Sequence, residues 1–93
     1  MKATLFVKPP EMGHCRACIA SVRQIDKLGL SGIIEVDDFN SEEGAEVLQE
    51  AREASVTEAP VLVVEVEGFA RELYGGYRPD ILRSLVADLR VTD

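Results

Sequence analysis

The residues most able to do chemistry in this chain are its only two cysteines, Cys15 and Cys18, in the stretch GHCRACIA. Such a pair can bind a metal ion, form a structural disulfide or act as a redox-active dithiol. Residues three positions apart at the start of a helix lie on one face, with Cα atoms about 5 Å apart, a separation that a disulfide allows. The two sulfurs are therefore predicted to be able to bridge.

The surrounding residues favour the redox interpretation. A structural zinc site takes about four ligands, and beyond the two cysteines the chain has a single histidine, His14. We therefore predict no metal. A structural disulfide across so short a loop removes little entropy from the unfolded chain. A redox-active dithiol next to a β-α-β pattern agrees with both spacing and context. A structural disulfide or two inert thiols stay open as alternatives.

The position of the pair predicts different roles for the two sulfurs. If a helix begins here, unpaired backbone N–H groups and the positive end of the helix dipole favour a thiolate at Cys15. Arg16 and a protonated His14 would add positive charge, although both also fit as solvated loop side chains. Cys18 lies one turn inside and is expected to keep its proton. We therefore predict Cys15 as nucleophile and Cys18 as resolving thiol.

Hydrophobic periodicity and turn residues predict seven elements in the order β-α-β-α-β-β-α. The expected strands are 3–7, 33–36, 61–66 and 69–74, and the expected helices are 18–28, 42–53 and 79–89. Ser41 is the expected cap of the second helix, with Ala45, Leu48 and Ala51 facing inward. Glu67-Gly68 is expected to form a two-residue hairpin turn. The pattern predicts an α/β fold in which three helices flank a four-stranded mixed sheet.

Composition sets limits on the partners. The chain has 93 residues, 46% of them hydrophobic, which fits one domain spanning residues 1–93. A net charge of -7 argues against nucleic acid and membrane surfaces as partners and predicts a basic docking patch on a partner protein. Without a visible export signal or membrane span, we expect a cytoplasmic protein that acts as a monomer.

Four segments resemble the NrdH-type glutaredoxin-like redoxins of the thioredoxin superfamily. They are Lys8-Pro9, CRAC at 15–18, Glu58-Ala59-Pro60-Val61, and Gly75-Gly76-Tyr77-Arg78-Pro79-Asp80. Two features depart from the family pattern: CRAC replaces its usual Cys-Val/Met-Gln-Cys, and the loop 10–14 is longer. The resemblance implies a thioredoxin/glutaredoxin-like fold covering nearly the whole chain.

The resemblance also implies a function. The chain would be a dithiol electron carrier that thioredoxin reductase recycles and that reduces ribonucleotide reductase. It would bind no cofactor and would use the Cys15–Cys18 disulfide. Pro60 would be cis, and the substrate would contact the residues Ala59, Pro60, Gly75, Gly76 and Tyr77, with Lys8, His14 and Arg16 in support. A glutaredoxin dependent on glutathione or another small thiol, and a redox-silent binding module, are the alternatives.

Overall fold

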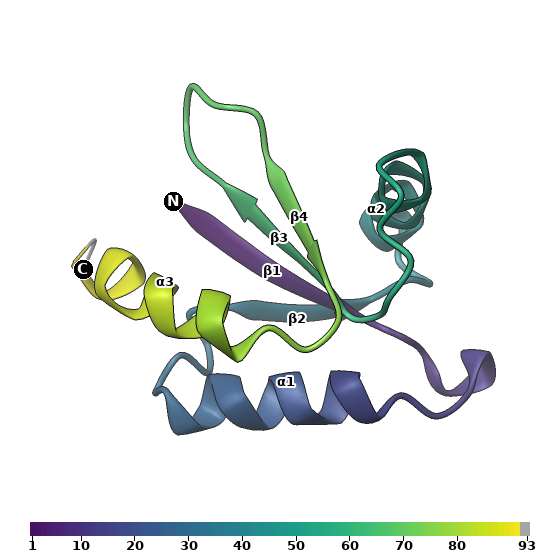
Figure 1. Cartoon of the computed structure of the whole chain (residues 1–93), viewed down its shortest axis with the longest axis horizontal. Helices are drawn as coiled ribbons and strands as arrows, with labels where there is room; N and C mark the ends of the chain where they lie inside the picture. Colours follow the sequence, from purple (N-terminus) through teal and green to yellow (C-terminus); the bar gives the residue numbers. More distant parts are fainter. Residues whose placement is uncertain (92–93) are drawn as a thin grey trace.

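The computed structural model describes residues 1–91 and contains four strands, three α-helices and one short 3-10 helix (Figure 1). In chain order they are β1 (Lys2–Val7), η1 (Pro10–Met12), α1 (Arg16–Lys27), β2 (Glu35–Asp38), α2 (Glu42–Glu53), β3 (Val61–Glu65), β4 (Glu72–Gly75) and α3 (Pro79–Val91). None of the helices within residues 1–91 is long and apolar enough to cross a membrane.

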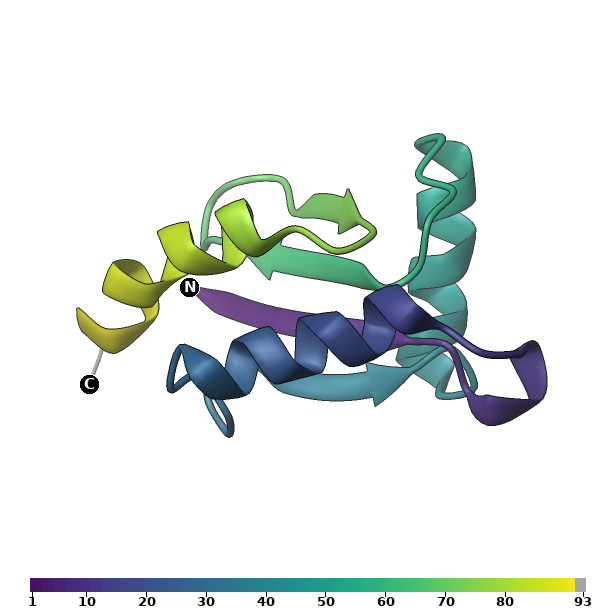
Figure 2. The same ribbon diagram turned by 60° about the horizontal axis from the view of Figure 1, so that its bottom comes forward.

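The strands form one mixed sheet in the order β2-β1-β3-β4. Strand β1 pairs in parallel with β2 and antiparallel with β3, and β3 pairs antiparallel with β4. Helices α1 and α3 cover one face of the sheet and α2 crosses the other (Figures 1 and 2). The predicted element order and the four-stranded mixed sheet with three flanking helices are confirmed.

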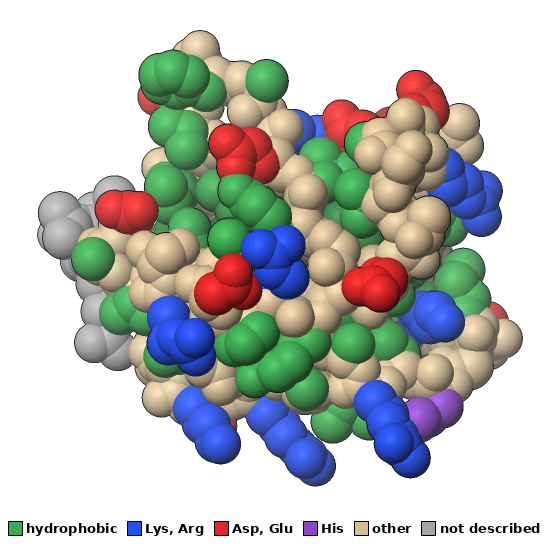
Figure 3. Space-filling view, viewed as in Figure 1, with side chains coloured by type: hydrophobic (Ala, Val, Ile, Leu, Met, Phe, Trp, Pro, Cys, Tyr) green, Lys and Arg blue, Asp and Glu red, His purple; other side chains and the backbone are tan. Residues whose placement is uncertain are grey.

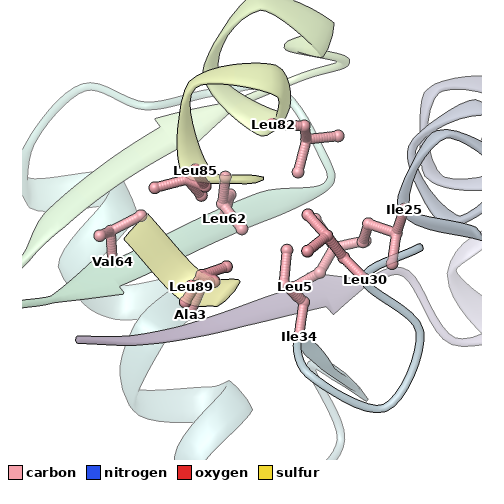
Figure 4. Close-up of a cluster of buried hydrophobic side chains, with 10 residues drawn as sticks. All are labelled: Ala3, Leu5, Ile25, Leu30, Ile34, Leu62, Val64, Leu82, Leu85 and Leu89. Carbon is pink, nitrogen blue, oxygen red and sulfur yellow. The ribbon is translucent and has the colours of Figure 1, made fainter. Parts of the chain in front are cut away.

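The two faces of the sheet bury separate hydrophobic clusters because alternate residues of a strand point to opposite sides. Leu5 of β1 packs with Ile25 of α1 and Leu82 of α3 in the first cluster, drawn in Figure 4. Phe6, the next residue, packs against Val47 of α2 in the second. The sheet is thus fixed on both sides, and α1 is held against it by its buried stripe.

The starts of α1 and β2 differ from the predicted ones, the first at the dithiol and the second at the opposite end of the sheet. Helix α1 begins at Arg16, two residues before the expected start, and Cys15 is its N-cap. Strand β2 begins at Glu35 rather than 33. The N–H groups of Ile33 and Ile34 both donate to the carbonyl of Leu30, so this segment forms a turn before the strand.

The expected inward face of α2 is confirmed at Ala51 and in part at Leu48, and it is wrong at Ala45. Ala45 is exposed and Leu48 is only partly buried, whereas Gly44, Val47 and Ala51 are buried. A Cβ atom at position 44 would overlap the backbone carbonyl of Asp38. The glycine therefore lets the first turn of α2 lie directly on the backbone at the end of β2.

The predicted two-residue hairpin was also wrong. A turn does form at Glu67-Gly68, with the Phe69 N–H donating to the Val66 carbonyl, but the ladder resumes only at Glu72. Residues 66–71 therefore form a loop, and Phe69, expected in a strand, is 78% exposed. Arg71 ties this loop to α2 through an ion pair with Glu50 at 2.7 Å.

Candidate dithiol site

The dithiol lies at the N-terminus of α1, where the sequence predicts it. Cys15 and Cys18 form a disulfide with their Cα atoms 5.2 Å apart. Cys15 has an extended backbone, and its Sγ accepts a hydrogen bond from the Cys18 N–H at 3.1 Å. The sulfur thus takes the place of a capping oxygen. The first turn of α1 has no acidic residue, so the positive end of the helix faces this sulfur without a neighbouring carboxylate.

The two cysteines differ in their access to solvent. Cys18 is 6% exposed, and it belongs to the buried stripe of α1 together with Ser21 and Ile25. Cys15 is half-buried and precedes the helix. Cys15 is therefore the more accessible of the two cysteines, and their division into nucleophile and resolving thiol stays a prediction.

A hollow of about 630 Å³ opens beside the disulfide. Lys8 from the end of β1 and His14 from the loop before α1 line it together with both cysteines, and its remaining wall is mostly apolar. Lys8 and His14 are exposed, as is Arg16 at the first helical position. Of these three predicted supporting residues, the structure brings Lys8 and His14 to the hollow.

The Ala59–Pro60 peptide bond is cis, as the resemblance implied. Pro60 is buried and directly precedes Val61, which pairs with Phe6 of β1. Because β1 and β3 are antiparallel, the start of β3 lies beside the end of β1. Lys8, which lines the hollow at the disulfide, also borders a second hollow with Ala59. The cis segment and the dithiol thus share one end of the sheet.

The predicted glycine pair packs against the cis segment. The Gly76 N–H donates to the carbonyls of Glu58, at 3.2 Å, and Pro60, at 2.9 Å. Gly76 has φ +80°, and a Cβ there would meet the Glu58 side chain. A Cβ on Gly75 would lie 2.6 Å from Val56 Cγ1. Both glycines therefore permit an approach that a side chain would block.

The start of α1, the start of β3 and the connection from β4 to α3 all lie at the same end of the sheet (Figures 1 and 2). Tyr77, in that connection, is 42% exposed. It follows the glycine pair and is open to a substrate, while Arg78 after it lies over the ring of Tyr74, with its guanidinium carbon 5.7 Å from the ring centre.

The long loop before Cys15 is ordered by contacts that sequence reasoning missed. Residues 10–12 form η1, and the carboxylate of Glu11 accepts a hydrogen bond from Asn40 Nδ2 at 2.7 Å. A backbone hydrogen bond and then this Asn40 contact lower the pKa of Glu11 below its ordinary value. The loop is therefore tied to the segment before α2, a contact between residues 29 positions apart that no local pattern signals.

Two further features of the site were not predicted. The carbonyl of Glu58 accepts a hydrogen bond from the Gly76 N–H, although the sequence assigned Glu58 no role at the site. Ile19 and Val22 of α1 line the hollow beside the disulfide and are 43% and 40% exposed. Ile19 and Val22 belong to the apolar periodicity that predicts this helix, and only their exposure in the fold marks them as lining the hollow. Among the described residues, no three His, Cys, Asp or Glu side chains are grouped so that they could hold a metal ion.

The geometry defines the class of fold: a thioredoxin-type sheet with a dithiol at the N-terminus of α1 and a cis proline before β3. No protein-family profile and no curated protein matches the chain. Among solved structures, it is similar to the glutaredoxin-like NrdH-redoxin of Escherichia coli, with a TM-score of 0.66. The two share 20% sequence identity, and the match covers 91% of this chain and 95% of that one. The expected resemblance is confirmed for the fold.

Proposed function

We propose that this protein is a thiol-disulfide oxidoreductase that reduces protein disulfides. The observation that carries the proposal is the Cys15–Cys18 pair at the helix start, at the same end of the sheet as the cis Ala59–Pro60 segment. Helix N-termini stabilise thiolates, and a helix-capping sulfur is already oriented toward the backbone N–H groups that would do so.

The reaction proceeds by two exchanges in the reduced protein. The Cys15 thiolate attacks one sulfur of the substrate disulfide, and the other substrate sulfur leaves as a thiolate that takes a proton from water. Cys18 then loses its proton and attacks Sγ of Cys15. The second substrate thiolate leaves, and the Cys15–Cys18 disulfide remains. The substrate has gained two electrons and two protons. A reductase must then supply two electrons and two protons to the Cys15–Cys18 disulfide to restore the dithiol.

The segment around Ala59 is the proposed holding site for the substrate chain. The flanking carbonyls of Glu58 and Pro60 are bound by Gly76, whereas no hydrogen bond within residues 1–91 uses the N–H or carbonyl of Ala59. These groups can pair with an extended segment in the manner of an added strand. Tyr77, exposed beyond the glycine pair, would cover that segment.

The family resemblance suggests the partners. We propose thioredoxin reductase as electron donor and ribonucleotide reductase as acceptor, with the protein acting as a monomer in the cytoplasm, where thiols are kept reduced. The similar E. coli structure is described as having a thioredoxin-like activity profile, which supports a reductase rather than a small thiol as the donor.

The test is NADPH-coupled reduction of insulin and of bis(2-hydroxyethyl) disulfide in the presence of thioredoxin reductase. Cys15→Ser should lose activity to background because no nucleophile remains. Cys18→Ser, the matched control, should still attack and should accumulate a mixed disulfide at Cys15, visible by mass spectrometry. Full activity in Cys15→Ser would refute the assignment of the nucleophile.

Exchanging the reductant separates this proposal from the glutaredoxin alternative. With thioredoxin reductase, the wild-type protein should turn over without any small thiol. If turnover instead requires glutathione or another small thiol and ignores the reductase, the protein is a glutaredoxin. If neither system reduces the Cys15–Cys18 disulfide, the redox function itself is wrong.

A further inference from the structure

The solvent-facing side of α1 carries a row of basic side chains. Arg16, Arg23 and Lys27 are spaced seven and four residues apart, so they lie on one face of the helix, and all three are exposed. Figure 3 shows Lys and Arg side chains along the edge below α1, close to the imidazole of the chain's single histidine. This basic row begins at the residue after Cys15.

The basic row is unneutralised within an acidic protein. The net charge is -7, yet none of the three row residues forms an ion pair with another residue in the part of the chain described. The one acidic residue of α1, Asp26, accepts a hydrogen bond from Ser31. Helix α1 therefore carries three basic residues and one acidic residue, so its charge is opposite in sign to the charge of the whole chain.

An apolar groove runs beside the basic row. Ile19 and Val22 line the hollow that contains both cysteines, and Arg23 borders the same hollow. A second hollow extends from Val22 to Val36 on the edge strand β2, where Val36 is 48% exposed, but Glu35 and Asp37 of β2 also line it. The apolar groove is therefore the part beside the disulfide that Ile19 and Val22 line, and toward β2 it ends at two carboxylates.

We propose that this groove and the basic row form a docking surface for an acidic segment of the redox partner, one that carries apolar side chains among its carboxylates. The inference rests on the proposed function and adds the chemistry of the partner. Carboxylates complement the basic row, and apolar side chains cover Ile19 and Val22. It reverses the expectation from net charge, which predicted a basic patch on the partner.

The test uses two peptides of equal length with identical leucines. Each carries one cysteine in a mixed disulfide with 2-mercaptoethanol, and the polar residues are glutamate in one and lysine in the other. The net charge of -7 predicts faster reduction of the lysine peptide, whereas the basic row predicts faster reduction of the glutamate peptide. At low salt we expect a glutamate-to-lysine rate ratio of about ten, falling toward one at high salt.

Matched charge reversals locate the effect. Arg23→Glu should lower the rate ratio at least about threefold, and the milder Arg23→Gln should give an intermediate value. Lys2→Glu changes the net charge equally, but Lys2 lies at the start of β1 whereas the dithiol follows its end, so the ratio should not change. Val22→Ser should slow the glutamate peptide without altering its salt dependence, because it removes only apolar contact.

Several results would overturn the docking surface. A faster lysine peptide, an equal effect of Lys2→Glu and Arg23→Glu, or an unaltered rate in Val22→Ser would each do so. A dimer at low salt that Arg23→Glu dissociates would assign the groove to a second copy of the chain instead. Failure to reduce bis(2-hydroxyethyl) disulfide, which has no charge, would count against the proposed function and not against the docking chemistry.

Discussion

Helices α1 and α2 have the same length and the same kind of cap, yet opposite electrostatic character. Each has 12 residues, and in each an N-cap side chain accepts a hydrogen bond from the backbone N–H three positions on. The acceptor is Cys15 Sγ in α1 and Ser41 Oγ in α2. In α2, Glu42 and Glu43 fill the first turn, whereas α1 has no acid there.

This difference shows which helix N-terminus has no carboxylate in its first turn. In α2 the carboxylates satisfy the dipole and stabilise the helix. The first turn of α1 has no carboxylate, so a Cys15 thiolate would be the anion that interacts with the positive end of this helix. The two helices also divide the surface: α1 carries the basic row, and α2 carries five glutamates. Four predictions test this comparison.

The largest expected effect is on the packing of α2. Gly44→Ala should destabilise the fold by about 2 kcal/mol or more, because the new methyl group would overlap the Asp38 carbonyl. Helix propensity alone predicts a gain of about 1 kcal/mol. Ala45→Gly, at the exposed neighbouring position, is the control and should cost about 1 kcal/mol. Urea denaturation measures both, and stabilisation by Gly44→Ala would contradict the packing described for α2.

The next effect compares the two caps. Ser41→Ala should cost about 1 kcal/mol because the Gly44 N–H loses its acceptor. Cys15→Ser, measured against reduced wild type, should change the stability by less than about 0.5 kcal/mol because a hydroxyl caps as well as sulfur. Denaturation in reducing buffer reports both values. A large loss in Cys15→Ser would show that the sulfur contributes more than a cap.

A smaller effect follows from giving α1 the first turn of α2. Arg16→Glu should slow the reaction of reduced Cys15 with iodoacetamide by about threefold to tenfold, because a carboxylate replaces a cation beside the thiolate. The helix itself should become more stable by a few tenths of a kcal/mol, since the new charge complements its dipole. The alkylation rate of Arg16→Gln should lie between those of the wild type and Arg16→Glu. An unchanged alkylation rate in Arg16→Glu would mean that charge in the first turn of α1 does not affect the reactivity of Cys15.

The smallest effect concerns the first turn of α3, where the carboxylate of Asp80 already forms an ion pair with Arg78. Arg78 binds Asp80 at 3.2 Å and lowers the pKa of that carboxyl below its ordinary value. The ionised carboxylate therefore stabilises the fold above its unfolded pKa, and this contribution is lost as the pH falls through the folded value. Arg78→Gln should raise the pKa of Asp80, whereas Arg83→Gln should not. Carboxyl NMR titration follows both.

The sequence predicts those parts of the fold that depend on local chemistry. The order of the elements, the capping role of Ser41 and the turn at Gly68 all follow from residue type and spacing, whereas Cys15 was expected near a helix start but not as its cap. The cis bond at Pro60 followed only from the family resemblance. The roles assigned to the substrate-contacting residues stay predictions, although the structure brings Gly76 onto the cis segment.

The parts that failed depend on tertiary packing. Helical periodicity does not decide whether Gly44 or Ala45 faces the sheet. Gly44 is buried because α2 approaches the backbone of Asp38 closely at this position. The strand expected to begin at Phe69 begins only at Glu72, because Glu72 is the first residue of this segment that pairs with β3. Positive charge beside the dithiol was predicted from Arg16 and His14, but the net charge alone does not show it, since a sum over the chain conceals the separation of basic α1 from acidic α2.

Strand β2 is an open edge of the sheet, and its four residues include three carboxylates, at Glu35, Asp37 and Asp38. An edge strand offers free backbone groups to any other strand, so it is a route to aggregation. Two copies meeting at this edge would bring six negative charges together, and the repulsion opposes their stacking. The carboxylates of β2 therefore oppose pairing of two copies at this edge.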